Sequence, residues 1–165
     1  MDKKILIAVD DSENSRAALL YVAGLLGGFP GFRAIILSVV AVPEEGYFHS
    51  PEERRLWLDE KTSAISRMLE RYREILIQAG FPEAKVKTEL AVASGVPVSS
   101  VILEKQEQFD ACTLVVGRRG ISKSEEFLFG SVSSRLIHQA GRCAVWVIEP
   151  VCKTDSLSKK NKNLI

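Results

Sequence analysis

The stretch that decides the fold is residues 112–133, which read CTLVVGRRGISKSEEFLFGSVS. Its first five residues, Cys112–Val116, are mostly apolar, as expected for a parallel strand that is covered on both faces. A loop bounded by Gly117 and Gly130 follows, and the next segment, Ser131–Ala140, is predicted to form a helix. Because ligands of open α/β sheets bind beyond the carboxyl ends of the strands, this unit indicates both a parallel sheet and the place of its binding site.

The rest of the chain continues this alternation of strand and helix. Four more runs are predicted to be strands, and they are Lys4–Val9, Ala34–Val42, Lys85–Ala91 and Ala144–Ile148. Further helices are predicted from Glu13 to the Gly27-Gly28 pair, from about Glu52 to Ala79, and from Gly95-Val96-Pro97 to about Gln108. The alternation predicts an α/β fold with three layers, in which a doubly wound parallel sheet of five strands lies between helices.

Two of these segments carry further information. Lys85–Ala91 alternates charged and apolar residues, which favours a strand at the edge of the sheet. The long helix carries an apolar stripe at helical spacing, made of Ile65, Met68, Leu69, Tyr72 and Leu76. We interpret this stripe as core packing rather than as a groove for a cofactor or partner.

The composition is that of a globular protein with nearly balanced charge. Of the 165 residues, 46% are hydrophobic and 26% charged, and 22 Lys and Arg oppose 21 Asp and Glu, which leaves a net charge of +1. This balance argues against a protein that captures nucleic acid or an anionic membrane surface. The length fits one domain, which we expect over residues 1–150, with a disordered polar tail over residues 151–165.

The chain is expected to be cytoplasmic. The apolar run before Asp10 is too short for the core of a signal peptide, and no run approaches the roughly 20 residues that span a bilayer. The three cysteines are an odd number without Cys-x-x-Cys spacing, which indicates reduced thiols. The two histidines, His49 and His138, lie far apart in the sequence, so we expect no zinc site.

The loop after Cys112–Val116 has the residue types of an anion site. Glycines allow the backbone to approach a phosphate closely, and the first N–H groups of the helix after Gly130 have no partner inside that helix. The hydroxyls of Ser131 and Ser133 add donors at the same place. The alternative is that these residues are ordinary turn and cap residues. The loop does not end in Gly-Lys-Ser/Thr, so it is not a Walker A loop.

The pattern Gly117-x2-Gly120-x9-Gly130-Ser131 closely resembles the ATP-binding signature of the universal stress proteins. The resemblance covers most of residues 3–150, including Lys4–Ser12, Gly95-Val96-Pro97 and Ala144–Ile148. It implies an adenine-nucleotide alpha-hydrolase-like fold with strand order 3-2-1-4-5. It also implies a homodimer paired through the last strand, by Ala144, Val145, Trp146, Val147 and Ile148.

The same resemblance implies the residues that bind ATP. They are Ala8, Asp10, Val39, Val116, Gly117, Gly120, Gly130, Ser131, Val132 and Ser133. Asp10 would contact the nucleoside, Val39 would meet adenine through its backbone, and the last five would hold the phosphates, with Mg²⁺ or Mn²⁺ accompanying the nucleotide. Asp11 departs from the residue usual in the family. A second carboxylate there could help to hold the cation, but we interpret it as a solvated residue at the start of a helix.

Three functions remain open at this point. The favoured one is an ATP-binding regulator of a stress response, whose nucleotide occupancy biases its conformation. The second is a slow ATP hydrolase or phosphotransferase, although no catalytic residue is assigned and His138 is expected on a helix surface. The third is a dimeric interaction scaffold without nucleotide, in which Trp146 anchors the interface. The sequence does not choose between ATP, AMP and other adenine nucleotides.

Overall fold

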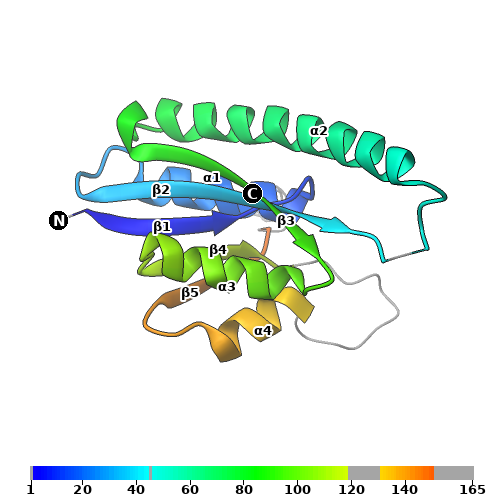
Figure 1. Ribbon diagram of the computed structural model, residues 1–165. Helices are drawn as coiled ribbons and strands as arrows, with labels where there is room; N and C mark the ends of the chain where they lie inside the picture. Colours follow the sequence, from blue (N-terminus) through cyan, green and yellow to red (C-terminus); the bar gives the residue numbers. More distant parts are fainter. Residues whose placement is uncertain (1, 45, 119–130, 151–165) are drawn as a thin grey trace, which may run out of the picture.

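A parallel sheet of five strands, with helices on both faces, forms the body of the molecule (Figure 1). The computed structural model describes residues 2–44, 46–118 and 131–150. The strands are β1 (Lys3–Ala8), β2 (Phe32–Val42), β3 (Val86–Ser94), β4 (Thr113–Gly117) and β5 (Ala144–Ile148). The helices are α1 (Glu13–Leu26), α2 (Pro51–Gln78), α3 (Val98–Phe109) and α4 (Ser131–Gln139), with a 3-10 turn η1 over Glu83–Lys85.

The strands lie in the order β3-β2-β1-β4-β5 and all neighbours are parallel. The predicted fold class and strand order are therefore confirmed, and β3 is an edge strand, as its alternating charges predicted. The central strand β1 pairs with β2 on one side and β4 on the other, so that Ala8 lies opposite both Leu37 and Val116. Each predicted strand exists, with ends that differ by a few residues.

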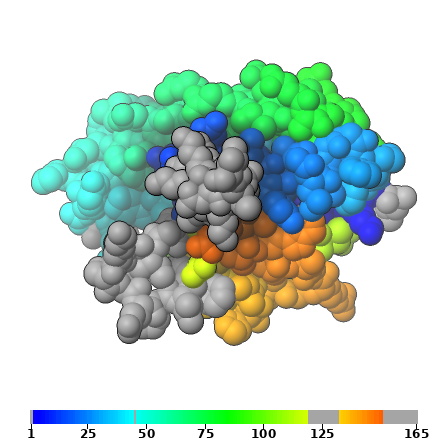
Figure 2. All heavy atoms as spheres, turned by 180° about the vertical axis from the view of Figure 1, so that it is seen from behind, coloured from blue at the N-terminus to red at the C-terminus, as the bar shows by residue number. Residues whose placement is uncertain are grey.

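Successive residues of β1 enter two separate cores. Ile5, Ile7 and Val9 pack with α1 and α2, whereas Leu6 and Ala8 pack on the face that α3 and α4 cover. Figure 2, seen from behind, shows α1 (blue) between α2 (cyan to green) and the segment around β5 (orange). Because both faces are covered, the central strands are apolar on both sides, which is why they read as continuous apolar runs.

The ends of the helices follow the expected signals. Ser12 is the N-cap of α1, where its hydroxyl accepts a hydrogen bond from the Ser15 backbone N–H at 3.2 Å. Gly27 ends that helix, and a Cβ atom there would lie 2.1 Å from the Ala79 carbonyl oxygen at the end of α2. The glycine therefore lets the two helix ends approach each other. Pro51 begins α2, one residue before the predicted start at about Glu52, with Ser50 as its N-cap.

The strand β3 runs to Ser94, beyond the predicted end at Ala91. Its last residues continue the pairing with β2, so that Val92, Ala93 and Ser94 lie opposite Val40, Ala41 and Val42. This pairing is non-local and leaves Val92 exposed, and neither feature is visible in the local pattern. The predicted tail, residues 151–165, lies outside the described residues.

Candidate functional site

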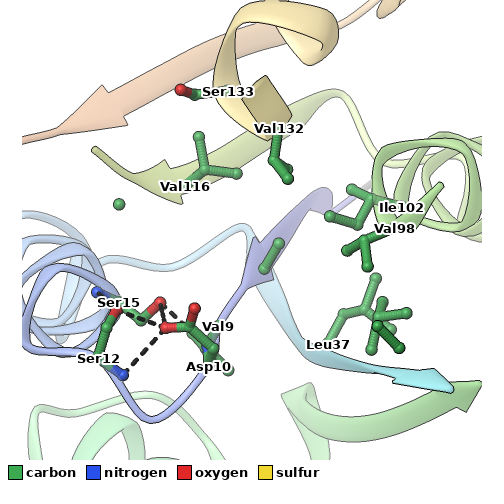
Figure 3. A pocket seen from close by; sticks show the side chains of 14 residues that line it. Val9, Asp10, Ser12, Ser15, Leu37, Val98, Ile102, Val116, Val132 and Ser133 are labelled. Carbon is green, nitrogen blue, oxygen red and sulfur yellow. Dashed lines mark hydrogen bonds between the residues drawn. The ribbon is translucent and has the colours of Figure 1, made fainter. Parts of the chain in front are cut away.

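A cavity of about 160 Å³ opens at the carboxyl ends of β1, β2 and β4 (Figure 3). After β1 the chain builds β2 and β3 on one side, and it returns to build β4 and β5 on the other. The cavity thus lies at the point where the strand order reverses, where open α/β sheets bind ligands. Its lining consists of Ala8, Val9, Asp10, Ser12, Ser15, Leu37, Val39, Ala41, Val98, Ile102, Val116, Gly117, Val132 and Ser133.

Asp10 is held in place by the first turn of α1. Its Oδ1 accepts hydrogen bonds from the Ser12 backbone N–H (3.0 Å), the Ser12 hydroxyl (2.5 Å) and the Ser15 hydroxyl (2.7 Å). The Asp10 backbone N–H in turn donates to Ser15 Oγ at 3.0 Å. Hydrogen bonds to a carboxylate are stronger than those between neutral groups, so this network fixes the direction of the acid in the cavity. A ligand hydroxyl or amino group would meet a preorganised acceptor.

Gly117 ends β4 beside the same turn. A Cβ atom at this position would lie 2.5 Å from both the carbonyl carbon and the oxygen of Asn14, and 2.8 Å from the Ser15 nitrogen. Only glycine permits this close packing of β4 against α1. The glycine that the sequence assigned to a nucleotide site therefore also has a role in packing.

The opposite wall of the cavity is apolar. Val98 and Ile102 come from α3, Val116 from β4 and Val132 from α4, and these side chains lie around the space in Figure 3. Val39, half-buried, adds the floor from β2. A cavity with an apolar wall, one fixed carboxylate and a helix N-terminus suits a flat apolar ring with polar substituents.

The structure brings together most of the predicted site residues. Ala8, Asp10, Val39, Val116, Gly117, Val132 and Ser133 all line the cavity. Ser131 is the first residue of α4, and its side chain is not among those described. Gly120 and Gly130 lie outside the described residues.

Sequence reasoning missed Ser15 as a site residue. Ser15 is 6% exposed and lies one turn before the buried Ala18 and Leu19 on the face of α1 that meets the sheet. In the sequence, Ser15 lies three and four residues before the apolar Ala18 and Leu19, in a helix that begins just after the acidic end of a strand. A polar residue on the apolar face of such a helix is the signal that could have revealed it. Val98 and Ile102 of α3 also face the cavity, although neither is among the predicted site residues.

Arg118, the residue after Gly117 in the glycine-bounded loop, pairs with an acid at the end of β5. Its Nη1 lies 2.7 Å from Glu149 Oε2, and its backbone N–H donates to the Ile148 carbonyl at 2.7 Å. Part of its charge is therefore compensated by Glu149. The neighbouring Arg119 lies outside the described residues.

Within residues 2–44, 46–118 and 131–150, no group of three or more His, Cys, Asp or Glu residues could hold a metal ion. In the same ranges, no helix combines the length and apolar character needed to cross a membrane. Cys112 and Cys143 are free thiols.

Known proteins resemble this chain in sequence and in fold over most of its length. A Staphylococcus aureus strain USA300 protein that carries the universal stress protein name is 26% identical over 171 residues, which cover 98% of either chain. The solved structure of hypothetical protein MJ0577 is 26% identical with a TM-score of 0.74, over 90% of this chain and 96% of that one. A universal stress protein family protein of Arabidopsis thaliana with AMP bound is 21% identical with a TM-score of 0.59, over 89% and 91% of the two chains.

The model of the universal stress protein family matches residues 1–149, which include every described strand and helix. The match agrees with the resemblance noted in the glycine pattern and with the observed strand order. The chain belongs to the universal stress protein family.

Proposed function

We propose that this protein binds ATP with Mg²⁺ in the cavity at the ends of β1 and β4, and that nucleotide occupancy regulates its action in a stress response. One observation carries the proposal. Residues from β2, β4, α4 and the β1–α1 connection line one cavity at the point where the strand order reverses, namely Asp10, Val39, Val116, Gly117, Val132 and Ser133. Solved universal stress proteins with this fold have been obtained with AMP, cAMP and dAMP.

The walls of the cavity suggest how the nucleotide lies. The adenine ring would pack between Val39 and the apolar side chains of α3, where burial of its faces is favourable. Asp10, held by Ser12 and Ser15, would accept a hydrogen bond from a ribose hydroxyl. The phosphates would pass Gly117 toward the start of α4, where unpaired helical N–H groups and Ser133 can donate to them.

The cation would depend mainly on the nucleotide. The described residues hold no cluster of ligands for Mg²⁺, so oxygens of the phosphates would supply most of its coordination. Asp10 is the carboxylate of the cavity and is already engaged with two serines. We therefore propose that Mg²⁺ enters and leaves with ATP.

The wider setting is part of the same proposal. Residues 1–150 would act as one nucleotide-binding domain in the cytoplasm, with residues 151–165 as a tail. Two copies would pair through β5, which is the last strand of the described sheet and has no neighbour on its outer side there. An open strand edge is a ready surface for pairing with a second chain.

Titration calorimetry of ATP with Mg²⁺ into protein that has been unfolded and refolded without ligand tests the site. Asp10→Ala should weaken binding roughly ten- to a hundredfold, because a hydrogen bond to a charged group contributes about 1.5–3 kcal/mol. Gly130→Val should weaken it as well by blocking the phosphates. The matched control is Asp11→Ala, which removes the adjacent exposed carboxylate and should leave the affinity unchanged.

Absence of heat from ATP with the wild-type protein would contradict the proposal. Equal losses for Asp10→Ala and Asp11→Ala would contradict the assignment of the cavity, because a general charge effect would then explain both.

A further inference from the structure

A second cavity of about 670 Å³ lies on the other face of the sheet, between α1, α2 and the end of β2. It is lined by Asp10, Asp11, Arg16, Ser38, Val39, Lys61, Ala64, Ile65, Met68, Arg71, Tyr72 and Ile75. Asp10 and Val39 also line the first cavity, so the two spaces lie back to back across the ends of β1 and β2. Its size falls within the range of roughly 300–1,000 Å³ that is usual for small-molecule sites. The proposed nucleotide function leaves this second space unused.

One wall of the second cavity is apolar and comes from a single helix. Ile65, Met68, Tyr72 and Ile75 recur at helical spacing along α2, and Met68 and Tyr72 are only 5% and 8% exposed. The stripe that the sequence assigned to core packing therefore has two roles. It packs against α1 and the sheet, and it also offers an apolar surface to whatever enters the cavity.

Cationic side chains from α1 and from the same helix α2 give the cavity an excess of positive charge. Arg16, Lys61 and Arg71 line the cavity against Asp10 and Asp11. Among the described residues, none of these three cations forms an ion pair, and the Lys61 ammonium lies 5.9 Å from the centroid of the Trp57 ring. Asp10 is already bound by Ser12 and Ser15. The three cations are therefore available to a negatively charged ligand.

Tyr72 places a hydroxyl near these charges. Burial raises the pKa of this hydroxyl, and the charges of Arg16 and Arg71 oppose that rise while those of Asp10 and Asp11 add to it. A neutral Tyr72 can donate a hydrogen bond to an anion that the two guanidinium groups hold.

We propose that this second cavity binds a small amphipathic monoanion, which is a carboxylate on an apolar body. The body would lie against Ile65, Met68 and Ile75, where each buried CH₂ group is favourable. The carboxylate would meet Arg16, Arg71 and Tyr72, because a guanidinium matches a carboxylate with two parallel hydrogen bonds. Asp10 and Asp11 disfavour a ligand with several negative charges, which distinguishes this site from one for a polyphosphate.

Decanoate is the probe for this proposal, and decanol and decylamine of the same chain length are its neutral and cationic counterparts. Each is titrated below its micelle or solubility limit into the full chain, with binding followed by calorimetry. Decanoate should bind at least tenfold more tightly than decanol, and decylamine should bind most weakly. Arg71→Gln should weaken decanoate binding about tenfold, since it removes a charged donor, and leave decanol binding unchanged.

Two matched variants locate the site. Arg67→Gln makes the same change on the exposed face of α2 outside the cavity and should leave decanoate binding unchanged. Ala64→Trp, at an exposed position of the lining, should fill the space and abolish binding without unfolding the protein, which circular dichroism verifies. Val98→Trp alters only the first cavity and should leave decanoate binding intact.

Three results would overturn the proposal. Equal affinities for decanoate, decanol and decylamine would show adsorption of the alkyl chain without recognition of charge. Equal effects of Arg71→Gln and Arg67→Gln would show a general charge effect. Loss of binding in Val98→Trp but not in Ala64→Trp would place the ligand in the first cavity.

Discussion

Ser15 and Asp10 bind each other twice. The Ser15 hydroxyl donates to Asp10 Oδ1 at 2.7 Å, and its oxygen accepts the Asp10 backbone N–H at 3.0 Å. One buried hydroxyl thus fixes both the backbone and the side chain of the residue that leaves β1 and enters the cavity. The hydroxyl has this double role because Ser15 lies in the first turn of α1, directly beside the end of the strand.

Replacing this hydroxyl should affect both stability and binding. Ser15→Ala leaves the Asp10 backbone N–H without its acceptor and removes one of the donors to the carboxylate, so it should lower the free energy of unfolding by about 1–3 kcal/mol. It should also weaken ATP binding, because Asp10 then keeps its hydrogen bonds from Ser12 but loses the one from Ser15, and its direction is less fixed. Urea denaturation and calorimetry measure the two effects. Ser66→Ala, at an exposed position of α2, is the control, and an equally small effect of both variants would contradict the importance of this contact.

Gly117 should prove essential for packing as well as for any ligand. The methyl group of Gly117→Ala would meet the Asn14 carbonyl group, so α1 must move away from β4, at a cost of about 1–3 kcal/mol in stability. Gly24→Ala is the control, and its stability should change in the opposite direction. Gly24 lies inside α1 with no atom within 4 Å of an added Cβ, so alanine should stabilise the protein by about 0.5–1 kcal/mol.

Denaturation in urea compares the two glycine variants. An unchanged or higher stability of Gly117→Ala would show that the contact with Asn14 does not constrain Gly117. Because unfolded protein also fails to bind ATP, the ATP affinity of Gly117→Ala is calculated for its folded fraction.

The edge of β5 offers a selective test of the proposed dimer. The Ala144 N–H donates to the Cys112 carbonyl at 2.9 Å and the Ile148 carbonyl accepts from Arg118, so these residues direct their backbone groups toward β4. Because backbone groups alternate along a strand, those of Val145 and Val147 point to the outer edge. Val147→Pro should therefore remove an edge donor, keep the β4–β5 pairing and yield a monomer in light scattering.

Val147→Thr keeps the backbone donor and is the control that should remain dimeric. A dimer of unchanged mass in Val147→Pro would move the interface elsewhere. Trp146 is a poorer choice for this test, because its ring makes an edge contact with Tyr21 at 6.3 Å and packs on the core that α1 covers. A substitution there would disturb folding and pairing together.

The sequence predicted the sheet well because its signal is local. Strands that are covered on both faces must be apolar at successive positions. The strands β1, β2 and β4 have this property. The extra length of β3 was not predictable in this way. Val92–Ser94 form a strand because the far end of β2 pairs with them, and such a partner does not show in the residues themselves.

The site was only partly predictable for a related reason. The glycine pattern identified residues whose backbone lies beside the proposed nucleotide site. The apolar residues that line the cavity could not be identified, because in sequence they resemble core residues. Ile102, for example, is 3% exposed and belongs to a core cluster, yet it also lines the cavity. Likewise, the stripe on α2 gave no sign that Ile65 and Met68 border a space, because that space exists only once α1 and β2 are in place.

Asp10 and Val39 border both cavities, and this shared wall has a thermodynamic consequence. A ligand that shifts the carboxylate or the valine on one face changes the affinity of the other face. Linkage requires the two effects to be equal in free energy, whichever ligand arrives first. If both proposed sites are used, the chain would respond to the two ligands together. The nucleotide concentration would set the concentration of amphipathic acid needed to fill the second cavity, and the acid would do the same for the nucleotide.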